Sequence, residues 1–349
     1  MSGILMMIIA IVVLGGAYLL YGRYLQNKWG IDPNAKTPAY ELEDGVDYVP
    51  ADTNVVFGHQ FASIAGAGPI NGPIQAAIFG WLPVLLWILI GGVFFGAVQD
   101  FASMYASVKN KGRTIGYIIE EYIGKLGKKL FLLFCWLFCI LVVAAFADVV
   151  AGTFNGFATS ESGAVTKVVA NGAVATTSML FIIEAVALGF FLKYSKFNKW
   201  VNTAVAVILL VVAIALGLNF PIYVSLGTWH LIIFAYILVA SVTPVWALLQ
   251  PRDYLNSYLL IFMILGAVIG VFVANPACNL EAFTAFSIPD ANGNPQYMFP
   301  ILFVTIACGA VSGFHSLVSS GTASKQIKNE KNMLPVSFGA MLMESILAV

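Results

Sequence analysis

The stretch FGHQFASIAGAGPINGP occupies residues 57–73, within an otherwise apolar run over 58–78. Glycine and proline crowd its second half, at Gly66, Gly68, Pro69, Gly72 and Pro73. Proline removes a backbone donor and clashes with the preceding helical turn. Non-helical backbone is tolerated at membrane depth only where protein buries it or where it lines a wet cavity. The stretch therefore predicts a membrane helix interrupted at its centre, whose freed backbone groups are able to bind an ion or a carboxylate.

The rest of the chain has the composition of a membrane protein. Of its 349 residues, 60% are hydrophobic and only 10% are charged, and the mean hydropathy is +0.89. Soluble domains carry about 25% charged residues, so lipid is the expected solvent. We predict an all-α integral membrane protein with a single transmembrane domain over 1–349. Its expected spans are 4–21, 58–78, 81–108, 130–151, 173–193, 200–219, 229–249, 256–274, 297–320 and an incomplete one over 336–349.

The basic residues predict the direction of each span. With the N-terminus outside and every segment crossing, all 17 Lys and Arg except Lys167 lie in or beside cytoplasmic loops, as the positive-inside rule requires. No basic residue precedes residue 4, so 4–21 is expected to be an anchor rather than a secretory signal. Loops 152–172 and 275–296 are then external, and 114–128 is expected to be an amphipathic helix on the cytoplasmic interface. The formal net charge of zero argues against a nucleic-acid partner.

A second interruption is expected at SVTPVW, residues 241–246, centred on Pro244. It lies five segments after the first and crosses in the opposite direction, which is typical of inverted-repeat transporters. A simple kink in a packed helix is the alternative. The layout resembles the leucine-transporter fold preceded by one extra helix, 4–21. Under that resemblance the last segment is the ninth core helix, so we expect the native protein to continue past Val349.

Ionisable groups inside membrane spans are costly and usually functional. Four acids lie within the predicted spans, namely Asp100, Asp148, Glu184 and Glu344. Asp100 shares a helical face with small residues, so it is expected to point at neighbouring helices. The alternative role for each acid is an interhelical hydrogen bond or the capping of a freed backbone amide.

Segment 297–320 carries a stripe of small and hydroxylated residues on one helical face, at Thr305, Gly309, Ser312, Ser316 and Ser319. Helix packing in membranes uses the same residue types, so packing alone would also explain the stripe. In the leucine-transporter fold the corresponding eighth core helix lines a sodium site with the first. That resemblance makes Ser319 and Ser320 candidate ion ligands.

The three histidines, His59, His230 and His315, lie within spans or at their ends. Histidine changes charge near physiological pH, so His59 and His315 are candidates for a proton relay. The alternative is that each donates to a neighbouring carbonyl. A metal site would need a third ligand, which no motif supplies. Cys135 and Cys139 lie four apart in an apolar run, which favours small buried side chains over a redox or metal pair.

Six stretches carry a family resemblance: DGVDYVPAD (44–52), FGHQFASIAGAGPINGP (57–73), GAVQDF (96–101), PRDY (251–254), FPILFVTIACGAVSGFHSLVSSGT (299–322) and GAMLMES (339–345). In this order they resemble the carbon starvation protein A family. The resemblance implies a bacterial inner-membrane carrier that takes up pyruvate or peptides during nutrient limitation, driven by a proton or sodium gradient. The family often has two histidines where this chain has His59 and Gln60, which puts a mechanism that needs both imidazoles in doubt.

We therefore expect a secondary active importer that works by alternating access, with its N-terminus outside. The expected substrate-binding residues are Gly66, Gly68, Pro69, Asn71, Gly72, Ser241, Thr243 and Pro244. The expected ion-coupling residues are His59, Asp100, Asp148, Glu184, Ser312, His315, Ser316, Ser319 and Ser320. No cofactor is expected beyond a coupling H+ or Na+, and the expected partners are the substrate and membrane lipid.

Two other classes of protein are alternatives to a transporter. A membrane sensor would bind the same nutrient without moving it, and its mark would be a soluble output domain. A membrane enzyme would need a clustered nucleophile and base or a set of metal ligands. The sequence contains no G-x-S-x-G or H-E-x-x-H motif, so we expect the protein not to be an enzyme.

Overall fold

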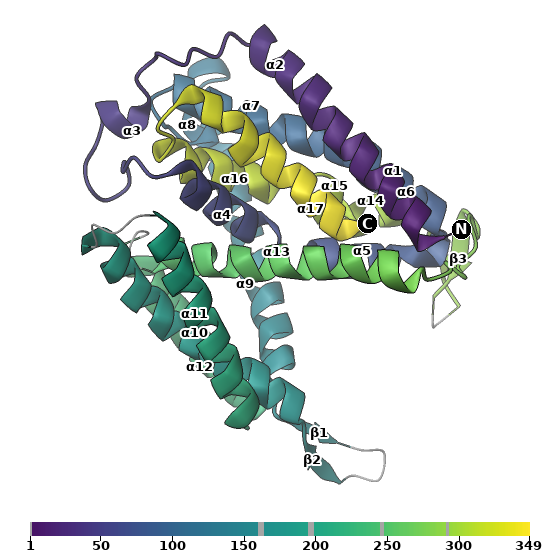
Figure 1. The fold of residues 1–349 in the computed structure, drawn as a ribbon. Helices are drawn as coiled ribbons and strands as arrows, with labels where there is room; N and C mark the ends of the chain where they lie inside the picture. The colour runs from purple at the N-terminus through teal and green to yellow at the C-terminus, as the bar shows by residue number, and fades with distance from the viewer. Residues whose placement is uncertain (1, 160–163, 195–198, 245–247, 291–292) are drawn as a thin grey trace. The chain divides into compact units, whose positions relative to one another are not determined.

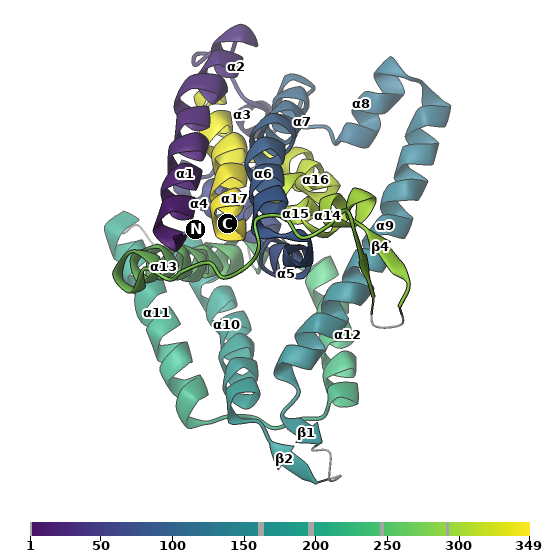
Figure 2. The ribbon, with the colours of Figure 1, turned by 90° about the vertical axis from the view of Figure 1, so that its right-hand side faces the viewer.

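The computed structural model describes residues 2–159, 164–194, 199–244, 248–290 and 293–349, and most of these residues are helical (Figures 1 and 2). Two compact units are present, each described here by itself. The first unit comprises Met1–Ile118 and Asn256–Val349, and the second comprises Ile119–Leu255. The expectation of a single transmembrane domain stays a prediction.

Six helices in the described part of the chain are long and apolar enough to cross a membrane. They are Gly3–Lys28, Trp81–Lys109, Lys125–Phe154, Val169–Phe191, Val201–Asn219 and Pro251–Ala274. A seventh apolar helix, Leu226–Val242, is shorter. The predicted fold class, an all-α multi-pass membrane protein, is thereby confirmed.

The first unit is built from two long helical rods and a set of short helices. The first rod is α1 (Gly3–Gly16), η1 (Ala17–Gly22) and α2 (Arg23–Lys28), and the second is α6 (Trp81–Gly91), η3 (Gly92–Ala97) and α7 (Val98–Lys109). The remaining elements are α3 (Pro38–Glu41), α4 (Thr53–Ile64), α5 (Gly68–Ala76), η2 (Ala77–Phe79), α14 (Met298–Thr305), α15 (Ala307–Ala310), α16 (Gly313–Gly321), η4 (Ala323–Lys325), η5 (Glu330–Asn332), η6 (Leu334–Gly339) and α17 (Ala340–Ala348). Helix α17 packs against both α1 and α6 (Figure 2).

The predicted interruption of segment 58–78 is confirmed. Helix α4 ends at Ile64, and Ala65 leaves the helical region with ψ of 64°. Helix α5 restarts at Gly68 with Pro69 in its first turn, where the missing N–H of proline costs no hydrogen bond. Segment 58–78 therefore consists of two separate short helices, α4 and α5, joined by a non-helical turn.

Segment 297–320 is also interrupted, although its sequence predicts one continuous helix. Two consecutive residues have extended backbone: Val311 has φ −162° and ψ 120°, and Ser312 has φ −130° and ψ 127°. The expected stripe on one continuous helical face is therefore wrong, because Gly309 and Ser316 belong to different helices. No proline marks this break, and side chains from other helices compensate for the lost helical hydrogen bonds, as described below.

A buried acid joins the polar loops of the first unit. Glu330 is 3% exposed and accepts hydrogen bonds from the Nζ of Lys109 at 2.7 and 2.9 Å. The same carboxylate accepts the backbone N–H of Asp32 at 2.9 Å. The segment after α2, the end of α7 and η5 are therefore tied together at one carboxylate.

The second unit consists of α9 (Lys125–Phe154), α10 (Val169–Tyr194), α11 (Lys199–Asn219) and α12 (Leu226–Val242). Helices α10 and α11 form a hairpin, and α9 packs on α12 through Phe154 and Trp229, whose ring centroids are 5.1 Å apart. Helix α13 (Leu249–Ala274) begins in the second unit and continues into the first. Helix α12 ends at Val242. Residues 245 and 246 of the SVTPVW motif lie outside the described residues, and the interruption expected there stays a prediction.

The connecting segments hold small structures of their own. The amphipathic segment expected over 114–128 forms α8 (Ile115–Tyr122) and ends before Gly124, whose φ of 103° no helix admits. The two loops expected outside the membrane each contain a β-hairpin. One pairs β1 (Phe157–Thr159) with β2 (Val165–Lys167), and the other pairs β3 (Ser287–Pro289) with β4 (Pro295–Tyr297).

Candidate functional site

The two interrupted segments of the first unit cross each other in antiparallel directions. On one side of the breaks, Nε2 of Gln60 on α4 donates to Oγ of Ser319 on α16 at 2.8 Å. On the other side, Gly68 of α5 faces Cys308 of α15 so closely that an added Cβ would lie 2.5 Å from the sulfur. Gly72 meets the Thr305 carbonyl in the same way. Glycine permits this approach because it has no side chain, and the two breaks lie side by side as a result.

The second break is supported by polar side chains from two other helices. Nε2 of Gln99 on α7 donates to the carbonyl oxygen of Ser312 at 2.7 Å. Oγ of Ser345 on α17 donates to the carbonyl oxygen of Gly309 at 3.1 Å. Backbone groups freed inside a membrane protein must find such partners. Helices α7 and α17 are therefore held against the break.

The same two helices each bring a carboxyl group to His315. Nδ1 of His315 on α16 lies 3.2 Å from Oδ2 of Asp100 on α7. Nε2 of the same ring lies 3.4 Å from Oε2 of Glu344 on α17. The side chains of His315, Asp100 and Glu344 are 1%, 0% and 0% exposed. We call these three residues the acid–histidine cluster.

The cluster has no basic side chain other than the imidazole. Within the described residues, neither Asp100 nor Glu344 forms an ion pair with a lysine or arginine. Two acids and one base buried together can bind and release a proton without any change of fold. No group of three or more His, Cys, Asp or Glu arranged to hold a metal ion occurs in the described part of the chain.

The serines predicted as ion ligands lie on α16 or directly before it, and three of them form hydrogen bonds within the protein. Ser319 and Ser320 are fully buried, and Ser319 accepts from Gln60 as described above. Oγ of Ser320 donates to the carbonyl of Ser316 at 2.7 Å, and Oγ of Ser316 donates to that of Gly313 at 2.9 Å. Ser312 is half-buried at the break and His59 is buried on α4. Their expected ion-coupling roles stay predictions.

The expected substrate residues of the first break differ in burial. Pro69 and Gly72 are buried, Gly68 is half-buried, and Gly66 and Asn71 are exposed. The amide of Gly66 donates to the carbonyl of Ile64 at 2.8 Å, and that of Asn71 donates to Ala67 at 2.9 Å. These two amides are already bonded within the break, so a substrate carboxylate would have to replace those bonds.

The candidates Asp148, Glu184, Ser241, Thr243 and Pro244 lie in the second unit. Oδ1 of Asp148 lies 3.1 Å from Nε2 of His230, and both side chains are exposed. Glu184 is half-buried, and its Oε2 atom has no hydrogen-bond partner among the described residues. The hydroxyls of Ser241 and Thr243 donate to carbonyls of their own helix, each at 2.8 Å. A substrate site shared by these residues and the first break stays a prediction.

Sequence reasoning assigned no role to Glu344, although it identified this acid inside the last span. It did not single out Gln99 or Ser345 at all. An acid within an apolar segment is itself a signal of function, and this signal pointed to Glu344. Gln99 meets a helix break that lies more than 200 residues away along the chain, and Ser345 meets the same break from about 35 residues away. No sequence pattern indicates either contact.

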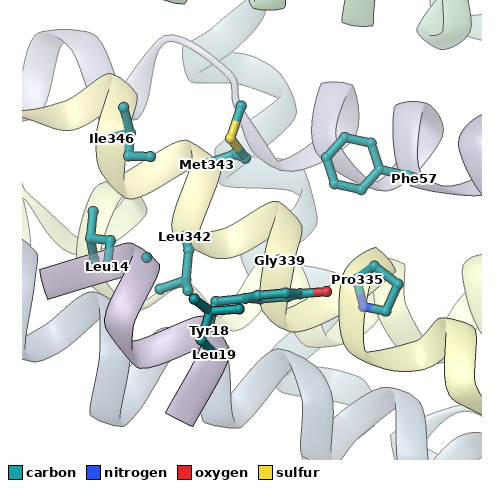
Figure 3. Close-up of a pocket in the computed structure, with 10 residues that line it drawn as sticks. Leu14, Tyr18, Leu19, Phe57, Pro335, Gly339, Leu342, Met343 and Ile346 are labelled. Carbon is teal, nitrogen blue, oxygen red and sulfur yellow. The ribbon is translucent and has the colours of Figure 1, made fainter. Parts of the chain in front are cut away.

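An apolar groove of about 360 Å³ lies elsewhere in the first unit (Figure 3). Its walls come from the α1–η1 rod, α4, and η6 with α17, and Tyr18 carries the single polar side chain in this lining. The groove is lined by Leu14, Gly15, Tyr18, Leu19, Phe57, Pro335, Gly339, Leu342, Met343 and Ile346. None of these residues belongs to the acid–histidine cluster.

Comparison with known proteins identifies relatives over the full chain. Residues 2–349 match the family model of carbon starvation protein CstA. The chain is 36% identical over 349 residues to peptide transporter CstA of Escherichia coli (strain K12), covering 95% of this chain and 47% of that protein. It is 38% identical over 346 residues to the pyruvate/proton symporter BtsT of the same strain, covering 95% and 46%. It is 36% identical over 374 residues to peptide transporter CstA of Bacillus subtilis (strain 168), covering 100% and 57%.

The chain thus spans about half the length of the curated relatives it matches. No solved structure matches it, and the leucine-transporter-like arrangement stays a prediction. The family model covers nearly every residue, including both interrupted segments and all three members of the acid–histidine cluster. The chain therefore belongs to the carbon starvation protein CstA family.

Proposed function

We propose that this protein is an ion-coupled secondary transporter that imports a small carboxylate such as pyruvate, or a peptide, across the bacterial inner membrane during carbon starvation. The observation that carries the proposal is the acid–histidine cluster, buried where two interrupted membrane segments cross. Intramembrane ionisable groups at such crossings mark ion and substrate pathways. The names of the relatives, a pyruvate/proton symporter and peptide transporters, support the same class of function.

The two breaks supply what alternating access requires. A helix divided into two short halves allows one half to tilt while the other stays packed, because no continuous hydrogen-bond ladder joins them. Helices α4 and α16 lie on one side of the breaks, and α5 and α15 lie on the other. Movement of one pair relative to the other would open the cluster to one face of the membrane at a time. The substrate is then expected to bind near Gly66 and Asn71, where the first break is exposed.

Transport by purified protein in liposomes tests the proposal. Uptake of radiolabelled pyruvate and of a labelled dipeptide is measured with an imposed proton gradient, a sodium gradient or neither. Accumulation of one substrate above its external concentration under one gradient, abolished by the matching ionophore, is the expected result. Protein-free liposomes are the control. Substrate binding without accumulation under every gradient would contradict transport and favour a nutrient sensor.

A further inference from the structure

We infer that the acid–histidine cluster is a one-proton site, and that Glu344 is the group that takes up and releases the proton. This inference rests on the proposed transport function and names the ion that drives it. It assigns Asp100 and His315 a fixed pairing role, whereas the sequence analysis treated them as general candidates for ion coupling. It also adds Glu344, to which no role had been assigned.

The geometry of the imidazole determines how many protons the cluster needs. Each ring nitrogen of His315 faces a different carboxyl group, at 3.2 and 3.4 Å. A neutral imidazole carries one N–H donor and therefore serves only one of the two acids, whereas the imidazolium carries two. With His315 charged and both acids ionised, the cluster has a net charge of −1. One added proton makes it neutral.

Burial selects the neutral form while the protein is closed. All three side chains are at most 1% exposed, and Asp100 lies nine residues, or about 14 Å along a helix, from the end of α7 at Lys109. An uncompensated charge is strongly unfavourable in such surroundings. The closed cluster therefore consists of one imidazolium, one carboxylate and one protonated carboxyl group.

The immediate surroundings favour Glu344 as the protonated acid. Both acids lie within ion-pair distance of the imidazole, Asp100 at 3.2 Å and Glu344 at 3.4 Å, and we assign the ion pair to Asp100. The other close ionisable neighbours of Glu344 are Asp100 and the Cys308 thiol, and neither brings a positive charge. The labile proton is therefore assigned to the carboxyl group of Glu344.

Other titratable side chains on the elements packed against the cluster are few, and most are occupied. They are His59 on α4, Cys308 on α15, Tyr105 and Lys109 on α7, and Lys325 on η4. Lys109 pairs with Glu330 at 2.7 Å and Lys325 pairs with Asp47 at 3.2 Å. Neither lysine is therefore available to neutralise the cluster. His59 is a further buried imidazole on these elements.

Coupling follows from the difference between a dry and a hydrated cluster. When one side of the crossing opens, water stabilises the ionised state, and the proton leaves Glu344. The cluster is then charged, and it can close again only after a proton returns. Sodium is a poor substitute, because it prefers oxygen ligands and an imidazole nitrogen lies between the two acids.

The first test uses Glu344→Gln, which imitates the protonated acid but cannot release a proton. This variant is expected to lose proton-driven accumulation and to retain exchange of internal for external substrate, because a permanently neutral cluster still closes. Glu121→Gln, which removes an exposed carboxylate of α8, is the matched control and is expected to accumulate substrate like the unmodified protein. Proton-driven accumulation by Glu344→Gln, or loss of its exchange activity, would overturn the inference.

The second test needs no substrate and separates the inference from the proposed function. Infrared difference spectroscopy of the protein in lipid detects a protonated carboxyl group through its C=O stretching band. The band is expected in the unmodified protein at neutral pH and absent in Glu344→Gln. It is expected to move to lower frequency when the glutamate carboxyl carbons are labelled with 13C and to stay in place when the aspartate carboxyl carbons are labelled, whereas a shift with labelled aspartate would overturn the assignment to Glu344. The presence of the band in Glu344→Gln would overturn the assignment even in a protein that transports. Failure of transport with the expected bands would instead count against the proposed function alone.

Discussion

Replacement of Gly68 by alanine tests directly whether the two interrupted segments cross where the structure places them. The new Cβ would lie 2.5 Å from the sulfur and 2.6 Å from the Cβ of Cys308. Ordinary contact begins near 3.4 Å, so α5 and α15 must separate by about 0.9 Å, the difference between 3.4 and 2.5 Å. Overpacking of this kind costs about 1–3 kcal/mol. The higher helix propensity of alanine offsets at most a few tenths of a kcal/mol of this cost, because Gly68 is the first residue of its helix.

The expected net destabilisation of Gly68→Ala is therefore about 1–2 kcal/mol, measured as the change in free energy of unfolding of the detergent-solubilised protein. Cys308→Gly removes both atoms that the new methyl group would meet. In that background the Gly68→Ala cost is expected to fall by about 1–2 kcal/mol, which a double-mutant cycle resolves. Gly16→Ala, at a helix position with no atom within 4 Å of the added carbon, is the matched control. Equal costs in both backgrounds would refute the close approach of α5 and α15.

Three further perturbations test the supports of the site and of the polar loops. Glu330→Gln removes the charged hydrogen-bond acceptor of Lys109, whose own side chain is 35% exposed. The first unit is therefore expected to lose about 1–3 kcal/mol of stability. Thermal unfolding measures this loss, and an unchanged midpoint would contradict it. Gln99→Leu removes the side-chain donor to the Ser312 carbonyl, which keeps the backbone N–H of His315 at 3.2 Å. A loss of about 0.5–1.5 kcal/mol is therefore expected in the same assay, and unchanged stability would show that the break does not depend on α7. Hydrogen bonds from the amides of Val46, Tyr48 and Asp47 lower the pKa of Asp44. The turn is therefore expected to be ordered at pH values above the ordinary carboxyl range, and to lose this order as the pH falls through the lowered pKa. Hydrogen exchange of these amides as a function of pH measures that loss, and protection that does not change on acidification would contradict it.

The glycines of the first break show how far local reasoning reaches. Gly66, Gly68 and Pro69 predict an interruption from backbone chemistry alone, and the structure confirms it between Ile64 and Gly68. The packing role of these glycines could not be predicted in the same way. That Gly68 admits Cys308 depends on a residue 240 positions later in the chain, and no local pattern contains it.

The second break shows where local reasoning fails. Segment 297–320 lacks an internal proline near Val311 and reads as one apolar helix with a stripe of small residues. The structure divides it because Gln99 and Ser345 take over the carbonyls of Ser312 and Gly309. A helix can exchange its own hydrogen bonds for those of neighbouring side chains when the two are similar in free energy. The outcome then depends on the neighbours.

The sequence by itself determined the solvent and the class of fold, because the number and length of apolar runs in a chain with 10% charged residues leave lipid as the solvent and the helix as the spanning structure. It also predicted which ionisable residues lie within apolar segments, since the cost of a charge there is a property of single positions. Only the tertiary structure decided that Asp100, His315 and Glu344 meet while the other candidates do not join them. Three residues from three helices, separated by up to 244 positions, come together through the packing of helices. Packing depends on every neighbour at once, whereas a sequence pattern reports only the residues along one helix.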